Sequence, residues 1–210
     1  MKNFLLSFLV LPATIYCQQI KPGKFSIELG IGRSRYDTEG NRYEITGRDN
    51  FTSGNRLWTN ADWRLNKICH AGFKIVYNRF EKNSSANTIC QAFTLIPDYT
   101  INFISTRSIQ TGFSFGFGLS YFDCRHVGKK YSTLAGTGLA SDILLQSVFY
   151  LDKMVSFMAG IGLDFLYYPK LHYQNNSFSN TGSNFLFPGF DYNLGFRFGF
   201  PEIKSEQKPN

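Results

Sequence analysis

A ten-residue segment near the middle of the chain, 112–121, alternates large apolar side chains with very small ones. Phe113, Phe115, Phe117, Leu119 and Tyr121 share one face of an extended strand, and every residue between them is glycine or serine. Successive side chains of a β-strand point to opposite sides, whereas a helix repeats every 3.6 residues. The segment therefore predicts a strand with one bulky apolar face and one face of small residues.

Seven further segments alternate in the same way, clearly at 25–32, 155–167 and 190–200, and less clearly at 57–65, 71–78, 93–103 and 139–151. The last of these is ambiguous, with Ile143, Leu145 and Phe149 expected to face outward. A lipid-spanning strand needs about 9–11 residues, and bacterial barrels of this kind have an even number of strands. We therefore predict an all-β fold, an eight-stranded antiparallel up-and-down transmembrane β-barrel.

The connections between the predicted strands also alternate in length. Residues 65–68, 105–108 and 152–153 form short turns, 81–86 is intermediate, and 37–56, 123–138 and 169–188 are long and polar. Short turns on one side and long loops on the other are typical of outer-membrane barrels. The alternative fold is a soluble lipocalin-like ligand-binding barrel, in which the Phe-rich face would line an internal cavity.

The N-terminus has the features of an export signal. Lys2 supplies a positive charge, residues 4–11 form a short apolar core, and Pro12 ends it. We assign residues 1–18 to a cleaved signal peptide, 19–200 to the barrel and 201–210 to a disordered polar tail. Cys17 leaves open a lipid-modified N-terminus.

The hairpin from Ile96-Pro97-Asp98-Tyr99 to Phe115-Gly116-Phe117-Gly118 resembles the family described as the outer membrane protein beta-barrel domain, and most of the chain resembles OmpA-like barrels of Gram-negative bacteria. The resemblance implies a protein of the cell outer membrane. Many members end on a strand-terminal Phe that serves as an assembly signal. Phe200 takes that place here, but ten residues follow it.

Several charged residues fall on the face opposite the apolar one and are expected inside the barrel. They are Glu28, Asp62, Arg64, Lys74, Asp98, Asp164, Asp191 and Arg197. Side chains just fill an eight-stranded interior, and an isolated buried charge is very unfavourable. We therefore expect a network of ion pairs, with Glu28 next to Arg197 because barrel closure makes the first and last strands neighbours. A narrow or gated polar path is the alternative.

No motif of catalysis, metal binding or cofactor binding is present. His70, His126 and His172 lack a partner at a recognisable spacing, so we predict no enzyme, no metal and no cofactor. Cys90 and Cys124 are expected near one rim on neighbouring strands, where a disulfide is possible in an oxidising compartment.

The formal net charge of +7 comes from scattered Lys and Arg residues, which argues against nucleic-acid binding. Outer-membrane lipid and lipopolysaccharide phosphates are the partners that this charge favours, together with an extracellular ligand of the long loops. We predict a structural or interaction role for a barrel that anchors those loops, and a small gated pore is the alternative function.

Overall fold

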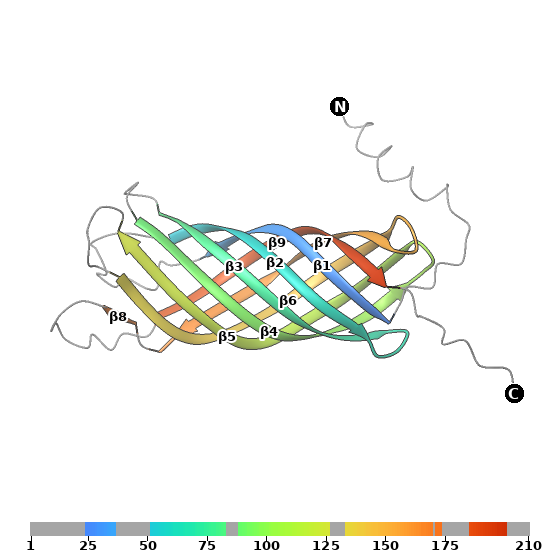
Figure 1. Ribbon diagram of the computed structural model, residues 1–210, viewed down its shortest axis with the longest axis horizontal. Helices are drawn as coiled ribbons and strands as arrows, with labels where there is room; N and C mark the ends of the chain where they lie inside the picture. The colour runs from blue at the N-terminus through green and yellow to red at the C-terminus, as the bar shows by residue number, and fades with distance from the viewer. Residues whose placement is uncertain are drawn as a thin grey trace, which may run out of the picture.

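The computed structural model describes residues 24–36, 51–82, 88–126, 133–169, 171–173 and 185–200. In these ranges the chain forms nine β-strands (Figure 1). They are β1 (Phe25–Tyr36), β2 (Phe51–Arg64), β3 (Cys69–Lys82), β4 (Thr88–Ser105), β5 (Ile109–His126), β6 (Thr133–Tyr150), β7 (Val155–Tyr168), β8 (His172–Tyr173) and β9 (Phe185–Phe200). Residues 1–18 and 201–210, which we assigned to the signal peptide and the tail, lie outside this part.

Eight of these strands close into a barrel in which every neighbouring pair is antiparallel. The order runs from β1 through β7 to β9, which pairs back with β1 (Figure 1). The two-residue β8 adds a short pairing at the edge of β6. The predicted eight-stranded antiparallel up-and-down barrel is therefore confirmed.

The pairing register fixes how steeply the strands tilt. A row of paired residues that starts at Phe25 on β1 passes through every strand and returns to β1 at Arg35, ten residues further along. This stagger of ten residues over eight strands gives a tilt of roughly 40° from strand rise and spacing, which is usual for barrels of this size. From β1 round to β9, each row of paired residues consequently moves along the barrel axis towards the end at which β1 finishes.

The two ends of the barrel differ in their connections. At the short-turn end, residues 65–68, 106–108 and 151–154 join the hairpins, and β1 begins and β9 ends there (Figure 1). The side chains of Asn66 and Thr106 accept backbone hydrogen bonds that close two of these turns. At the opposite end, here called the long-connection end, the strands are joined by 37–50, 83–87, 127–132 and 169–184.

The strands extend further towards the long-connection end than the sequence predicted. We assigned residues 51–56, 123–126, 133–138 and 185–188 to long connections, but they belong to β2, β5, β6 and β9. On β2 strand pairing continues beyond the outward apolar pattern, because a strand that leaves the apolar layer needs no apolar outer face. On β9 the exposed Leu186 continues the apolar pattern.

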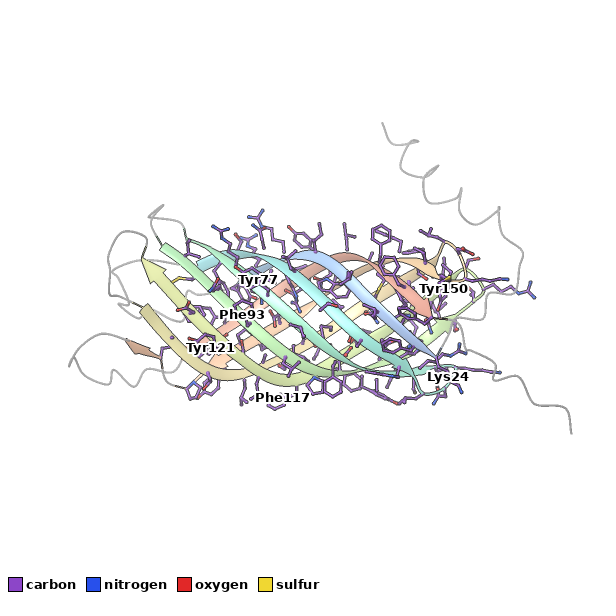
Figure 2. All side chains as sticks on the ribbon, in the orientation of Figure 1. Lys24, Tyr77, Phe93, Phe117, Tyr121 and Tyr150 are labelled. Atoms are coloured by element: carbon purple, nitrogen blue, oxygen red, sulfur yellow. A yellow bond between two sulfur atoms is a disulfide. The ribbon has the colours of Figure 1, made fainter. Side chains whose placement is uncertain are left out.

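The apolar faces of the strands point away from the barrel axis (Figure 2). Phe117 is 63% exposed, and Leu29, Ile143 and Leu194 are each 50% exposed, whereas the residues between the outward ones are buried or half-buried. Ile143, Leu145 and Phe149 face outward as expected. The lipocalin-like alternative is wrong, because it requires these side chains inside the barrel.

Aromatic side chains lie near both ends of the outer wall. Tyr77, Phe93 and Tyr121 are paired neighbours on β3, β4 and β5 towards the long-connection end (Figure 2). Phe25 lies between Trp63 and Phe200 at the short-turn end, stacked on Phe200 and tilted against Trp63. Such rings suit the two interfaces of a membrane. No helix within the described ranges is long and apolar enough to cross a membrane.

Candidate functional site

The centre of the barrel interior is organised around Arg56. This side chain projects inward from β2 and is 3% exposed. Its guanidinium contacts Asp191 on β9 directly, and it lies 3.5 Å from Asp164 on β7 and 3.6 Å from Asp142 on β6. One cation thus holds carboxylates from three other strands together in a space that water barely reaches.

Lys74 forms a second centre beside the first. Its Nζ lies 2.9 Å from Asp142 Oδ2 and 4.0 Å from Asp98 Oδ2. Asp98 Oδ2 also accepts hydrogen bonds from Ser114 Oγ at 3.1 Å and from Asn60 Nδ2 at 3.4 Å. Asp142 therefore links Lys74 to Arg56, and the two cations belong to one continuous network.

A third group of charges lies towards the short-turn end. Arg197 Nε donates to Glu28 Oε1 at 2.7 Å, and the two residues are direct partners in the pairing of β1 with β9. The structure thus contains the pair that we expected from closure. Asp62 lies 3.9 Å from Arg197 and 2.7 Å from His70 Nδ1. Asn60 donates to Glu28 as well, which joins this group to the second.

Seven of the eight charged residues expected in the interior are buried there, and Arg64 differs. Arg64 is the last residue of β2, is only half-buried, and donates its Nε to the backbone oxygen of Asn66 in the adjoining turn. Arg64 therefore lies at the mouth of the barrel, at the short-turn end.

Sequence reasoning missed Arg56, Asp142 and His70. Arg56 falls in a range that we assigned to a long connection, and Asp142 lies on the strand whose two faces the sequence left ambiguous. His70 lies beside the turn 65–68, at the start of β3, and its side chain is 4% exposed. The available signal was parity, because each of the three continues the inward set of its own strand.

Five aromatic rings close the barrel interior at the long-connection end. This aromatic plug consists of Tyr36, Phe80, Phe122, Tyr168 and Phe187, one each from β1, β3, β5, β7 and β9. Neighbouring ring centroids lie 5.2–6.2 Å apart, within the range of favourable aromatic contacts.

Hydrogen bonds connect the aromatic plug to the polar interior on its short-turn side. Tyr36 Oη donates to Asp164 Oδ2 at 2.8 Å, and Tyr168 shares a hydrogen bond of 2.7 Å with Ser120. Each tyrosine thus presents its ring to the plug and its hydroxyl to the interior. The plug and the charge network form one continuous filling.

A disulfide joins Cys90 on β4 to Cys124 on β5, and the two residues are direct partners in the strand pairing. Both side chains face inward and pack with the aromatic plug. The disulfide fastens two neighbouring strands where the barrel wall meets the plug. Cys69 is a free thiol on the outer face of β3.

Trp58 fills the middle of the interior, and two glycines give it room. A Cβ on Gly30 would lie 2.5 Å from the indole, and one on Gly195 would lie 2.9 Å from it. Trp58 packs with Val76, Val148 and other inward apolar side chains. The inward glycines predicted from the sequence therefore allow close approach of a large ring at this level.

Other site types find little support within the described ranges. No group of three or more His, Cys, Asp or Glu residues there is placed to hold a metal ion. The structure describes the backbone of His126 and His172 but not their side chains. His70 is the histidine whose contacts are described, and its neighbours are Asp62 and Gln110.

A closed antiparallel barrel with apolar side chains outside and charged ones inside is the architecture of the small outer-membrane β-barrels, and this chain has that fold. No protein-family model and no curated protein matches the sequence.

Solved structures of this class are similar to the chain. Neisserial surface protein A aligns with a TM-score of 0.58 at 14% identity, over 86% of this chain and 99% of that one. Ail, the attachment invasion locus protein of Yersinia pestis, in complex with the heparin analogue sucrose octasulfate, aligns at 0.51 and 12% identity, over 86% and 100%. A major outer membrane protein from Thermus thermophilus aligns at 0.51 and 10% identity, over 84% and 99%. At these identities the likeness is one of fold.

Proposed function

We propose that this chain is a protein of the bacterial outer membrane whose barrel conducts no ions, has no enzymatic activity and anchors its long connections at the cell surface. The filled interior is the observation that supports this most. The aromatic plug spans one end, and the network around Arg56, Lys74 and Arg197 lies below it. Side chains can fill an eight-stranded barrel completely, so no permanent aqueous channel is needed to explain the buried charges.

The composition of the connections supports the second part of the proposal. Residues 174–184 consist mostly of Asn, Ser, Gly and Thr, and residues 127–132 include two adjacent lysines. Such polar segments can project into water from a wall that is held in lipid. A structural or interaction role follows, with an extracellular ligand bound by these connections.

The first prediction concerns conductance. The purified wild-type protein in a planar bilayer is expected to give no steady single-channel steps, because the aromatic plug and the Arg56 network both obstruct the axis. A double variant, Phe122→Ala with Phe187→Ala, removes two rings of the plug but leaves the network. It is expected to remain without steady conductance, because the network around Arg56 is intact. This result would show that the network obstructs the axis without the full aromatic plug.

The pore alternative makes the opposite prediction. Steady steps from the wild-type protein that disappear in an Arg197→Glu variant would show that ions pass the buried Glu28–Arg197 pair. That result would overturn the proposal of a closed barrel. Heat-modifiable migration on gels confirms that each variant has folded before it is measured.

The second prediction concerns orientation. An epitope inserted between Gly40 and Asn41 is expected to bind antibody on intact cells, because residues 37–50 join β1 to β2 at the long-connection end. The same epitope appended after Asn210 is the control, since β9 ends at the opposite end. It is expected to bind only after the outer membrane is permeabilised. The reverse pattern would contradict the proposed orientation.

A further inference from the structure

Three arginines lie together on the outer wall towards the long-connection end. Arg33 and Arg35 project outward from β1, and Arg79 projects outward from β3; all three are exposed. Among the outward-facing residues whose side chains are described on β6, β7 and β9 at this level, none is charged. Among the described side chains on the outer wall at this level, the arginines therefore lie on β1 and β3.

This arginine cluster lies directly above the apolar outer wall. Arg33 is two residues beyond Ile31, and Arg79 is two residues beyond Tyr77, on the same faces of their strands. Asn55 on β2 separates them, since it pairs with both Arg33 and Arg79. The change from apolar to polar side chains marks the level at which lipid tails give way to headgroups.

The stagger of the barrel brings the three side chains to similar heights. Arg35 lies two residues above Arg33 on β1. Arg79 lies two strands away, and ten residues of stagger over eight strands raise it by the equivalent of roughly 2.5 residues. The Cα atoms of Arg33 and Arg79 are then about 10 Å apart across β2, which long side chains can bridge around one ligand.

The Arg33 side chain is directed upward from its lower position. Its Nη2 donates to Ser53 Oγ at 3.1 Å, and Ser53 lies nearer the long-connection end than Asn55, the direct partner of Arg33. This is the snorkelling expected of an arginine whose stem lies against apolar surface. It directs the Arg33 guanidinium towards the level of Arg35 and Arg79.

We propose that Arg33, Arg35 and Arg79, with Ser53 and Asn55 between them, bind the phosphate groups of lipopolysaccharide in the outer leaflet. Guanidinium groups match phosphate oxygens in pairs and are favoured for this recognition. The position on the wall, at the edge of the apolar surface, selects a lipid headgroup over a soluble anion. Within the described strands, the acidic positions beside the cluster are Glu81, which pairs with Ser53 and whose side chain is not described, and Asp123 on β5. Asp123 is two strands beyond Arg79 in the same paired row and accepts a hydrogen bond from Gln91.

The test uses the full chain in nanodiscs of phosphatidylcholine that contain diphosphoryl lipid A, with bound lipid A counted by native mass spectrometry. The variant R33Q/R35Q/R79Q is expected to retain roughly tenfold less lipid A than the wild type. The matched control, K67Q/R107Q/K153Q, removes the same charge from the short turns and is expected to retain the wild-type amount. The variant R33K/R35K/R79K is expected to lie between them, because lysine lacks the paired donors.

Three results would overturn the proposal. Wild-type retention by the glutamine variant would show that the cluster is no binding site. Equal losses in both triple variants would show diffuse charge attraction. Tight binding of inorganic pyrophosphate in detergent, lost with R33Q/R35Q/R79Q, would assign the cluster to a soluble anion. If the triple variant fails to fold, R35Q and R79Q are measured singly. The site rests on the proposed orientation, but these results leave the conductance test unaffected.

Discussion

Replacement of Arg56 by methionine is expected to destabilise the barrel by about 3–5 kcal/mol, the range observed when one partner is removed from a buried ion pair. Arg56 is 3% exposed, and it lies within 3.6 Å of a carboxylate oxygen from each of Asp142, Asp164 and Asp191. Methionine fits the volume but leaves these carboxylates without their shared cation. Urea unfolding in phospholipid vesicles, followed by tryptophan fluorescence, measures the loss.

Two further variants separate this effect from a general loss of charge. Arg107→Met removes an exposed arginine in the turn 106–108 and is expected to change stability by less than about 0.5 kcal/mol. Adding Asp164→Asn and Asp191→Asn to Arg56→Met removes the repulsion and is expected to restore part of the lost stability. Equal stability of Arg56→Met and the wild type would show that the network does not hold these strands together.

The sequence predicted the sidedness of the barrel well in its middle and poorly towards the long-connection end. In the middle, apolar outward residues such as Phe117 alternate with small inward ones, so membrane contact imposes the pattern. Beyond that level the outward positions are polar, with Arg33, Asn55 and Arg79, and the inward positions are mixed, with Ser34, Arg56 and Phe80. The strands continue, but the contrast between the two faces has gone, and Arg56 was therefore assigned to a connection.

The sequence predicted only some of the side chains that fill the barrel interior. Charges such as Glu28 and Arg197 stand out against a row of small residues, and closure alone makes them neighbours. Phe80, Phe122 and Phe187 are inward residues of a kind that the membrane pattern places outside. Only their parity, counted along a whole strand, distinguishes ring-filled interior from lipid-facing wall. Which rings meet across the barrel depends on the ten-residue stagger, which no single strand reveals.

On β1 and β3, residues of the aromatic plug and of the arginine cluster lie on opposite faces of the strand. Tyr36 and Arg35 are adjacent on β1, and Phe80 and Arg79 are adjacent on β3, so one member of each pair faces the axis and the other faces outward. The level that closes the barrel is consequently the level at which the wall becomes polar. A lipid bound by the arginines would connect β1 to β3 across β2 from outside, at the level where the rings pack within.

The membrane assignment itself predicts a depth-dependent effect of charge on the outer wall. Leu194→Arg is expected to destabilise the barrel by about 2–4 kcal/mol, because Leu194 lies midway along β9, between Ile31 and Ala159 in the pairing, where an arginine would face the lipid tails. Urea unfolding in phospholipid vesicles again provides the measurement.

Leu65→Arg is the matched control, because Leu65 is 60% exposed, against 50% for Leu194, but lies in the turn 65–68. Near the membrane interface the same substitution is expected to change stability by only about 0–1 kcal/mol. If the wall faced water, neither arginine would matter, since substitutions at exposed sites of soluble proteins change stability by about 0.5 kcal/mol or less. Equal and small effects at both leucines would therefore contradict the assignment of the outer wall to lipid. The proposed membrane anchor and the proposed phosphate site would then be wrong as well.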